Sequence, residues 1–593
     1  MNALPYRVPV DDIVFVLTQV LRIQERDDLP GFEGLDVPGL RVLVTEAARF
    51  HEEVLLPLSL SGDREGAHFE DGSVITPHGF PQAWRQYRES GWPFVSVPAE
   101  LGGGGLPPVM AAIISEMRIS CAHSFAMYGA FCYAAATMIG ELGAPWMATG
   151  IAPRIAAGDW TATMCLTESH AGSDLRQIQT RAVAQDDGTW RLYGEKIFIS
   201  GGDHDLTDNI VHIVLAKIPD AHGRVTDELD TIGVFVVTKV LIDPASGSLM
   251  APNALRATSI EHKMGVEGSA TCTLAFDGAV GWQITDSRAS GLAHSMGPMF
   301  YLMNKARVST AMSGVAYAEA SYQVARNYAR TRTSGRAPQG ARHPESAADP
   351  IVVQPDIRRL LLSARAFAEG ARALGLHMAV LQSEAESLGD AQAQAIVELM
   401  TPVMKAYFTD RGFEAATNCL QVLGGHGYIR DYGIEQLLRN ARVGQIYEGA
   451  NGIQARDLMR MITRRPNAAE AFFTAIQTSV TRARQMDIEA PADGVEVALL
   501  ALSKATGELA SYDEGSRAAV AYDLLTAYGI LAIAWTWLEI LLLDETIEIK
   551  GVLESKRVLA RFWFERELPM LDMHVTRVMS GGATLNELPD DLV

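Results

Sequence analysis

The sequence is poor in cysteine, and its cysteines show no paired spacing. Five occur in 593 residues, at Cys121, Cys132, Cys165, Cys272 and Cys419. A scattered set of this kind provides neither a disulfide framework nor a zinc site, and we predict no metal centre. Isolated cysteines behave as small apolar side chains. We therefore expect buried thiols in a reducing compartment.

Positive charge is also scarce. The chain has 50 lysines and arginines against 71 aspartates and glutamates, which gives a formal charge of −21 and a pI near 5.1. A protein that binds nucleic acid neutralises many phosphates with lysine and arginine side chains. The charge balance therefore argues against a nucleic-acid partner.

Long apolar runs are missing as well. The most apolar run, Leu524–Leu538, is shorter than the roughly 20 residues that a membrane-spanning helix needs. The N-terminus shows no basic segment followed by an apolar one, so we predict no secretory signal. We expect a cytoplasmic protein without membrane association, in which this run forms a buried helix or a subunit contact. Peripheral membrane attachment is the alternative.

Length and periodicity predict several domains in a mostly α protein with one β domain. A chain of 593 residues is too long for one compact core, and about three to five domains are expected. Short β-type runs follow residue 160, whereas long helical patterns occupy Met299–Thr331, Asp356–Glu386 and Ala391–Gly424. We predict a helical leader at 1–37, an α domain at 38–160, a β domain at 161–277, a four-helix bundle at 278–465 and an additional helical domain at 466–593.

One stretch, Leu420–Met459, carries the strongest chemical signal. Glu448 stands between two helical patterns, in an interval punctuated by Gly444, Gly449 and Gly452. We predict a short loop, on which a carboxylate can act as a base while a nearby backbone amide polarises the molecule that it deprotonates. A surface glutamate at a helix end is the structural alternative.

Two further segments have the composition of a cofactor-binding loop and strand. Met164–Leu175, MCLTESHAGSDL, combines hydroxyl side chains with small residues that allow a phosphate to approach the backbone. About 30 residues later, Lys196–Asp205, KIFISGGDHD, ends a β-type run with an aromatic residue and a hydroxyl. Alone, the first segment is also consistent with a capped polar loop and the second with a plain strand end.

Together these segments resemble the acyl-CoA dehydrogenases. QVLGGHGY is similar to the family's QxLGGxGY/F segment, QIYEGANGIQ to its IYEGT-x-x-IQ loop, MCLTESHAGSDL to its CxTEPxAGSD signature and KIFISGG to its KxWITN/S strand. The resemblance is strong from about residue 38 to 462. The extra C-terminal helices are typical of a larger bacterial branch that includes 3-methylmercaptopropionyl-CoA dehydrogenase-like enzymes. It implies the acyl-CoA dehydrogenase fold, with a helical N-terminal domain, a β-barrel-like middle domain and a C-terminal helix bundle.

The resemblance also implies a reaction and a set of site residues. The reaction is FAD-dependent α,β-dehydrogenation of an acyl-CoA thioester to the trans-2-enoyl-CoA, as in fatty acid β-oxidation, with Glu448 taking the α-proton and FAD N5 accepting the β-hydride. The implied cofactor-binding residues are Met164, Leu166, Thr167, Ser173, Phe198, Ser200, Arg332, Ser334, Gln421, Gly424 and Gly425. The implied substrate-binding residues are Ser173, Phe125, Tyr128, Asn304, Arg307 and Gly449. Aromatic residues such as Phe125 and Tyr128 are equally consistent with core packing.

Partners and substrate follow from the same resemblance. Arg332 and the Gln421–Gly425 segment meet FAD from different subunits in the family, which predicts a homodimer or homotetramer. We expect an electron-transferring flavoprotein as acceptor and a medium- or long-chain fatty acyl-CoA as substrate. The alternatives are a 3-methylmercaptopropionyl-CoA dehydrogenase, an acyl-CoA oxidase and, in a different class, a DNA-binding flavoprotein, which the negative charge disfavours. A helical scaffold without a cofactor is the remaining alternative.

Overall fold

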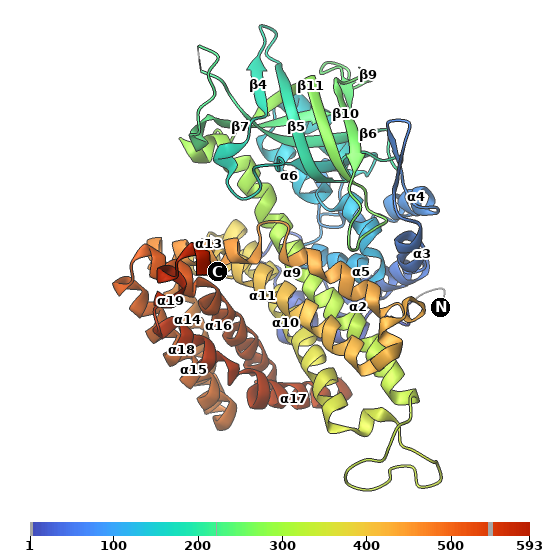
Figure 1. Ribbon diagram of the computed structural model, residues 1–593, viewed down its shortest axis with the longest axis vertical. Coiled ribbons are helices and arrows are strands. Elements are labelled where there is room, and N and C mark those ends of the chain that lie inside the picture. The colour runs from blue at the N-terminus through green and yellow to red at the C-terminus, as the bar shows by residue number, and fades with distance from the viewer. Residues whose placement is uncertain (1–3, 221, 544–549, 593) are drawn as a thin grey trace.

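A computed structural model describes residues 4–220, 222–543 and 550–592 of the chain. The outer ends of the predicted leader and of the predicted C-terminal domain, together with residues 544–549, therefore lie outside the described residues. A β domain lies at one end of the molecule, long helices form the centre, and the C-terminal helices pack beside them (Figure 1). The predicted class, mostly α with one β domain, is confirmed.

The N-terminal part is helical, as predicted, but contains one hairpin that the sequence did not reveal. Its helices are α1 (Val10–Phe15), α2 (Val37–Phe50), α3 (Leu58–Glu65), α4 (Phe80–Ser90), α5 (Pro108–Ala126), α6 (Cys132–Leu142), α7 (Pro145–Gly150) and α8 (Ala152–Ala156). α2 begins where the Asp36 carboxylate caps the amide of Gly39. Strands β1 (His68–Glu70) and β2 (Ser73–Ile75) form the hairpin and are too short to give a clear alternating pattern.

The β domain is built on one seven-stranded sheet. Its strands run in the order β10-β11-β5-β4-β6-β3, and β7 pairs with both β11 and β6. The strands are β3 (Trp160–Cys165), β4 (Arg181–Ala184), β5 (Trp190–Ser200), β6 (Asn209–Lys217), β7 (Ile232–Thr238), β10 (Leu255–Ile260) and β11 (Thr271–Ile284). β8 (Val240–Ile242) and β9 (Leu249–Pro252) form a separate pair. β11 continues past residue 277, where the sequence analysis ended the domain.

The central helices pack unusually closely at one crossing. They are α9 (Leu292–Thr331), α10 (Pro355–Leu388), α11 (Ala391–Leu423), α12 (Ile434–Ala441) and α13 (Asn451–Arg464). A Cβ atom on Gly314 of α9 would lie 2.0 Å from the carbonyl oxygen of Phe408 on α11. Only glycine allows the two backbones to approach in this way. This close crossing fixes the position of α9 relative to α11.

The C-terminal helices form a further layer against the bundle. They are α14 (Pro466–Gln485), α15 (Glu489–Glu508), α16 (Glu514–Leu541), α17 (Lys550–Phe562), α18 (Met570–Met579) and α19 (Ala583–Glu587). The apolar run Leu524–Leu538 lies within α16, where its side chains are mostly buried. In the described parts of the chain, two helical stretches, Pro108–Leu142 and Glu514–Leu541, are long and apolar enough to span a membrane, and most of each is packed inside the protein. All five cysteines are buried free thiols.

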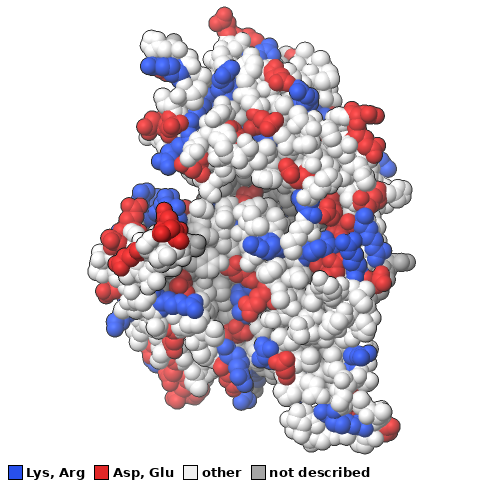
Figure 2. Space-filling model, in the orientation of Figure 1, with Lys and Arg blue, Asp and Glu red and all other residues white. Residues whose placement is uncertain are grey.

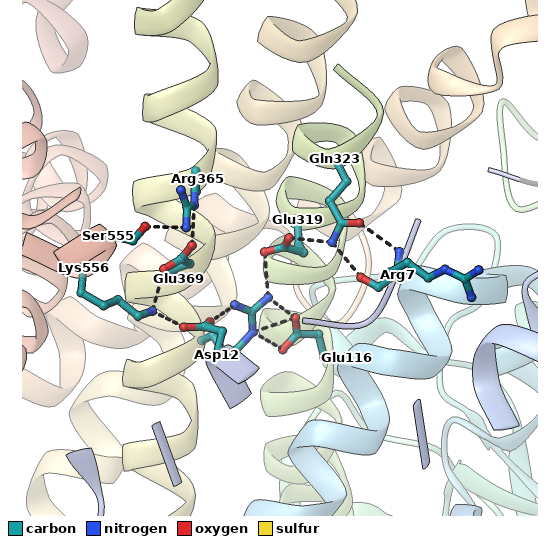
Figure 3. A network of polar contacts seen from close by, with 10 residues as sticks. Arg7, Asp12, Glu116, Glu319, Gln323, Arg365, Glu369, Ser555 and Lys556 are labelled. Carbon is teal, nitrogen blue, oxygen red and sulfur yellow. Dashed lines mark hydrogen bonds and ion pairs between the residues drawn. The ribbon is translucent and has the colours of Figure 1, made fainter. Parts of the chain in front are cut away.

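A buried network of charged side chains joins the N-terminal segment, the bundle and the C-terminal helices (Figure 3). Arg372 of α10 bonds to Glu116 of α5 at 2.6 Å and to Glu319 of α9 at 3.0 Å, and it also pairs with Asp12 of α1. Asp12 in turn pairs with Lys556 of α17, which lies 2.7 Å from Glu369. Arg372 and Lys556 are almost completely buried. Buried charges are tolerated when they are paired in this way.

Candidate active site

A cavity of about 690 Å³ lies where the β domain meets the helices. The space-filling view is hollowed at this junction (Figure 2). Its wall combines residues from α5, from the loop after β3, from the end of β5, from α9 and from the loop before α13. The cavity therefore brings together the three segments that the sequence analysis singled out.

The end of β3 and the loop after it present four of the predicted cofactor-binding residues to the cavity. Met164, Leu166, Thr167 and Ser173 all line it. The loop is held from behind by the buried Lys196 of β5, whose Nζ donates to the Leu166 carbonyl at 3.0 Å and to Glu168 at 2.8 Å. A buried ion pair with additional hydrogen bonds gives such a loop one defined shape.

The end of β5 contributes an aromatic face. Phe198 and Ser200 line the cavity, and Phe198 has a left-handed backbone (φ 59°) with 58% of its surface exposed. A β-branched or bulky residue rarely adopts this conformation, and an exposed aromatic ring favours a partner that covers it. The ring, together with the hydroxyls of Thr167, Ser173 and Ser200, fits a flat aromatic cofactor with polar edges, as the FAD prediction requires.

Glu448 lies on the predicted loop, between α12 and α13, and lines the same cavity. Its backbone is left-handed (φ 54°), as is that of Gly449 (φ 80°), and Gln454 fixes this turn by donating to the Glu448 carbonyl at 3.0 Å. The carboxylate oxygen Oε2 is buried without a hydrogen-bond partner among the described residues. Burial raises the pKa of Glu448 to about 7, although Arg307 and Lys405 act to lower it.

Two cations lie near this carboxylate but are engaged elsewhere. Arg307 of α9 bonds to Asp457 of α13 at 3.2 Å. Lys405 of α11 donates to the Gly449 carbonyl at 2.7 Å and to Asn451 Oδ1 at 2.9 Å. Because neither cation forms a direct ion pair with Glu448 in the described structure, the carboxylate keeps a raised pKa and one free oxygen.

A second cavity, of about 460 Å³, adjoins the first. Four residues belong to the walls of both: Arg118, Ala130, Ala306 and Ser309. Asn304 and Arg307, both predicted to bind substrate, line the second cavity and not the first. Gly449 lines the first cavity, beside Glu448.

Phe125 and Tyr128, which were predicted to contact substrate, line neither of the two cavities. Phe125 is completely buried and packs against Phe80, with ring centroids 5.4 Å apart. The Tyr128 hydroxyl donates to the Gly268 carbonyl at 3.0 Å and accepts from the Ala270 amide at 2.9 Å. Both rings therefore belong to the core. Ile119, His123 and Ala126 of α5, and Met127 directly after it, border the cavity instead.

The remaining predicted cofactor residues lie on the surface, outside both cavities. Arg332 and Ser334 follow the end of α9, and Gln421, Gly424 and Gly425 lie at the end of α11; all five are exposed. Within one chain they do not join the site formed by Thr167 and Phe198. Their predicted contacts with FAD would require a second copy of the chain.

Several further residues belong to the site. Arg118 lines both cavities and reaches Ser309 at 3.4 Å, and Lys405 and Gln454 hold the Glu448 loop. Gln454 is the last residue of the QIYEGANGIQ segment, whereas no motif marks Arg118 or Lys405, because each lies in an ordinary helical pattern and meets its partners only through the fold. The arrangement as a whole provides a base of near-neutral pKa beside an apolar cavity with an exposed aromatic wall, which suits abstraction of a weakly acidic proton.

Comparison with protein families gives matches along most of the chain. The N-terminal, middle and C-terminal domain models of acyl-CoA dehydrogenase match residues 40–159, 163–279 and 298–463. A model described as acetyl-CoA dehydrogenase C-terminal like matches residues 472–589.

Curated relatives and solved structures agree with these matches. A 3-methylmercaptopropionyl-CoA dehydrogenase of Ruegeria pomeroyi is 38% identical over 77% of this chain and 76% of its own length. A broad-specificity linear acyl-CoA dehydrogenase of Mycobacterium tuberculosis is 34% identical over 79% of this chain and 77% of its own. The fold is similar to Caenorhabditis elegans ACDH-11 in complex with C11-CoA, with a TM-score of 0.75, 19% identity and coverage of 95% and 92% of the two chains. A Bacillus anthracis acyl-CoA dehydrogenase complexed with FAD gives a TM-score of 0.72 at 18% identity, with coverage of 95% and 91%.

Proposed function

The chain belongs to the acyl-CoA dehydrogenase family, and from this premise we propose that Glu448 removes the α-proton of an acyl-CoA thioester to give the trans-2-enoyl-CoA. The family assignment makes the protein an FAD-dependent oxidoreductase that acts on acyl-CoA. The observation that carries the proposal is the position of Glu448, a carboxylate with a pKa near 7 on the wall of the cavity that also contains Thr167 and Phe198.

The residues of this chain would act on the substrate in three ways. Glu448 takes the α-proton through its free oxygen Oε2. The backbone N–H of Glu448, which donates to no other described residue, is available to the thioester oxygen and stabilises the negative charge that develops there. The apolar wall, including Ile119 and Met303, excludes water from the reacting carbons.

Thr167, Ser173, Phe198 and Ser200 are the residues of this cavity that would hold the flavin. When bound, FAD supplies a hydride acceptor for the β-carbon. The protein's task is then to hold the substrate between Glu448 and these residues, so that both C–H bonds are correctly oriented.

For the substrate we propose a medium- or long-chain linear acyl-CoA. The second cavity, of about 460 Å³, adjoins the cavity that contains Glu448 and supports an acyl group of considerable length. Each buried methylene contributes about 0.8 kcal/mol, so kcat/KM should rise by at most about fourfold per methylene until the cavity ends. The relative from Mycobacterium tuberculosis, described as acting on linear acyl-CoA with broad specificity, supports this choice.

A second candidate substrate is 3-methylmercaptopropionyl-CoA. The 38% identical relative is named for this compound. In addition, Arg118 and Ser309 place polar groups in the wall between the two cavities, where a purely aliphatic chain would gain nothing from them. A short acyl group with a polarisable sulfur would suit that wall better than a long hydrocarbon.

We also propose an electron-transferring flavoprotein as acceptor and a homodimer or homotetramer as the functional unit. The exposed positions of Arg332 and of Gln421, Gly424 and Gly425, outside both cavities, support the assembly, since they leave these residues accessible to another copy of the chain. A comparison of the rate at which the reduced enzyme is reoxidised in air with the rate at which the flavoprotein reoxidises it would distinguish a dehydrogenase from an oxidase.

Anaerobic bleaching of the flavin by a panel of acyl-CoAs tests the proposed function. The panel should run from butyryl-CoA to palmitoyl-CoA and include 3-methylmercaptopropionyl-CoA. Bleaching that accelerates with chain length supports the first candidate. A sharp preference for the sulfur compound selects the second, and an absence of bleaching by every thioester would overturn the assignment of the reaction.

A further inference from the structure

We propose that the C-terminal helices help to position the catalytic base and to favour its ionised form. Tyr522 of α16 and Asp410 of α11 hold Lys405, a positioning residue, under the loop that carries Glu448. This inference rests on the proposed role of Glu448. It gives the helices beyond residue 466 a function in the reaction, in addition to any part in assembly.

Lys405 is the centre of the arrangement. Its side chain is completely buried, and its ammonium group donates to the carbonyl of Gly449, the residue after Glu448, at 2.7 Å. It also donates to Asn451 Oδ1 at 2.9 Å. A lysine is rarely buried without a carboxylate partner, because desolvation of its charge costs several kcal/mol. The desolvation of the Lys405 charge must therefore be offset by negative charges slightly farther away.

Asn451 and Asp410 connect Lys405 to both sides of the loop. Asn451 Nδ2 donates to the Ala406 carbonyl at 3.1 Å and to Asp410 Oδ1 at 2.8 Å. Asp410 Oδ1 also accepts from Gln445 Nε2 at 2.7 Å, and Gln445 precedes Glu448 in the chain. Asp410 thus ties the residues before and after Glu448 to one point on α11.

Tyr522 completes the connection from the C-terminal helices. Its hydroxyl donates to the second oxygen of Asp410, Oδ2. α16, which carries Tyr522, packs against α13, the helix that begins at Asn451 directly after the loop. A continuous chain of hydrogen bonds therefore runs from Tyr522 through Asp410, Asn451 and Lys405 to the carbonyl of Gly449.

The charged groups around Glu448 show how this chain of hydrogen bonds can affect the protonation of the base. Arg307 of α9 and Lys405 both lower the pKa of Glu448, against the larger effect of burial. Asp457 of α13 pairs with Arg307, Asp410 lies near Lys405, and Arg118 of α5 faces the neighbouring Tyr447. Burial lowers the pKa of Lys405 to about 8, although Glu448 and Asp410 act to raise it. Lys405 is therefore still charged in the range where Glu448 ionises, and its charge favours the ionised base.

Lysine substitutions test the inference through the pH dependence of flavin bleaching in the intact holoenzyme. Loss of the charge in Lys405→Met should move the rise of the bleaching rate upward by about one pH unit, and should slow bleaching about fivefold at pH 7. Most of the rate should return at pH 9. Lys405→Arg keeps the charge and should stay near the wild-type profile. Lys504→Met, which removes an exposed lysine of α15, is the matched control and should leave the profile unchanged.

A tyrosine pair tests the part played by the C-terminal helices without altering the core. Tyr522→Phe removes the bond to Asp410 and should slow bleaching at pH 7 about threefold, with a smaller upward shift of the profile. Tyr512→Phe, which removes a phenol that donates to the Val578 carbonyl at 3.0 Å, is the control and should have no effect on bleaching.

The outcomes separate this inference from the proposed function. If Glu448→Gln is slow but Lys405→Met and Tyr522→Phe keep the wild-type pH profile, Lys405 is only structural and the inference is overturned. If Glu448→Gln bleaches at the wild-type rate, the proposed base itself is wrong. A Lys405→Met protein that does not fold leaves Tyr522→Phe against Tyr512→Phe to decide.

Discussion

Two carboxylates in this molecule, Asp12 and Glu448, have nearly the same charged neighbours and opposite behaviour. Each has one arginine and one lysine nearby, and each has a carboxylate oxygen that is buried. Asp12 forms direct ion pairs with Arg372 and Lys556, which hold its pKa below the usual value although burial acts to raise it. At Glu448 burial prevails and raises the pKa to about 7.

The difference lies in contact and not in the kind of charge. Arg307 is paired with Asp457, and Lys405 with the Gly449 carbonyl and Asn451, so both act on Glu448 only at a distance. Direct contact offsets the cost of burying a carboxylate and makes it a structural group. Without that contact the carboxylate keeps a raised pKa and lowers the stability of the folded protein, which is common for catalytic groups.

Disrupting the ion pairs around Asp12 should have the largest effect, and this effect should be on stability. Arg372→Met would leave Glu116, Glu319 and Asp12 without their common partner, and should lower the free energy of unfolding by about 3–5 kcal/mol. Urea denaturation followed by fluorescence measures the loss. Arg484→Met, which breaks an exposed pair with Glu496, is the control and should cost less than about 1 kcal/mol. Equal losses in the two variants would show that the buried network adds nothing to stability.

Breaking the Glu448 region should damage the reaction and spare the fold. Glu448→Gln should slow anaerobic bleaching by substrate at least about 100-fold, the usual scale for losing a general base, while the visible flavin spectrum stays almost intact. Because the pKa of Glu448 is raised, its ionised form costs stability as the pH rises toward 7, so the glutamine variant should melt at an equal or higher temperature at pH 8. If Glu448→Gln has a lower melting temperature and an unchanged bleaching rate, Glu448 is a structural group and not the base.

Moving the carboxylate should have a smaller, positive effect. Ala306 of α9 lines both cavities and immediately precedes Arg307. Glu448→Ala combined with Ala306→Glu should therefore bleach about tenfold faster than Glu448→Ala alone, because a second carboxylate then reaches the same cavity. If the double variant is no faster than the single one, Ala306 does not face the reacting carbon.

Much of the fold and part of the site could be predicted from the sequence. The long helices α9, α10 and α11 have clear periodicity, and Glu448, Thr167 and Phe198 lie in recognisable segments that the fold brings to one cavity. Local pattern alone cannot show which residues of α5 and of the turn after it border the cavity, and Phe125 and Tyr128 pack in the core.

The residues that set the properties of Glu448 were beyond prediction for a related reason. Lys405 contacts the loop because α11 packs against α12 and α13, and Tyr522 contacts Asp410 because α16 packs against α11 and α13. These partners lie far apart in the sequence. Nothing in their helical surroundings distinguishes them from ordinary core or surface residues. The same holds for Asp12, whose partners Arg372 and Lys556 come from helices distant in the chain.

The pH dependence of anaerobic flavin bleaching, measured side by side for the wild-type protein and Glu448→Gln, tests the central claim most directly. In the wild-type protein the base is protonated below its pKa of about 7 and ionised above it, so the rate should rise about tenfold per pH unit below pH 7 and level off above it. The glutamine variant should be slow and independent of pH across the same range. A glutamine variant with the wild-type rise near pH 7 would show that another group takes the proton.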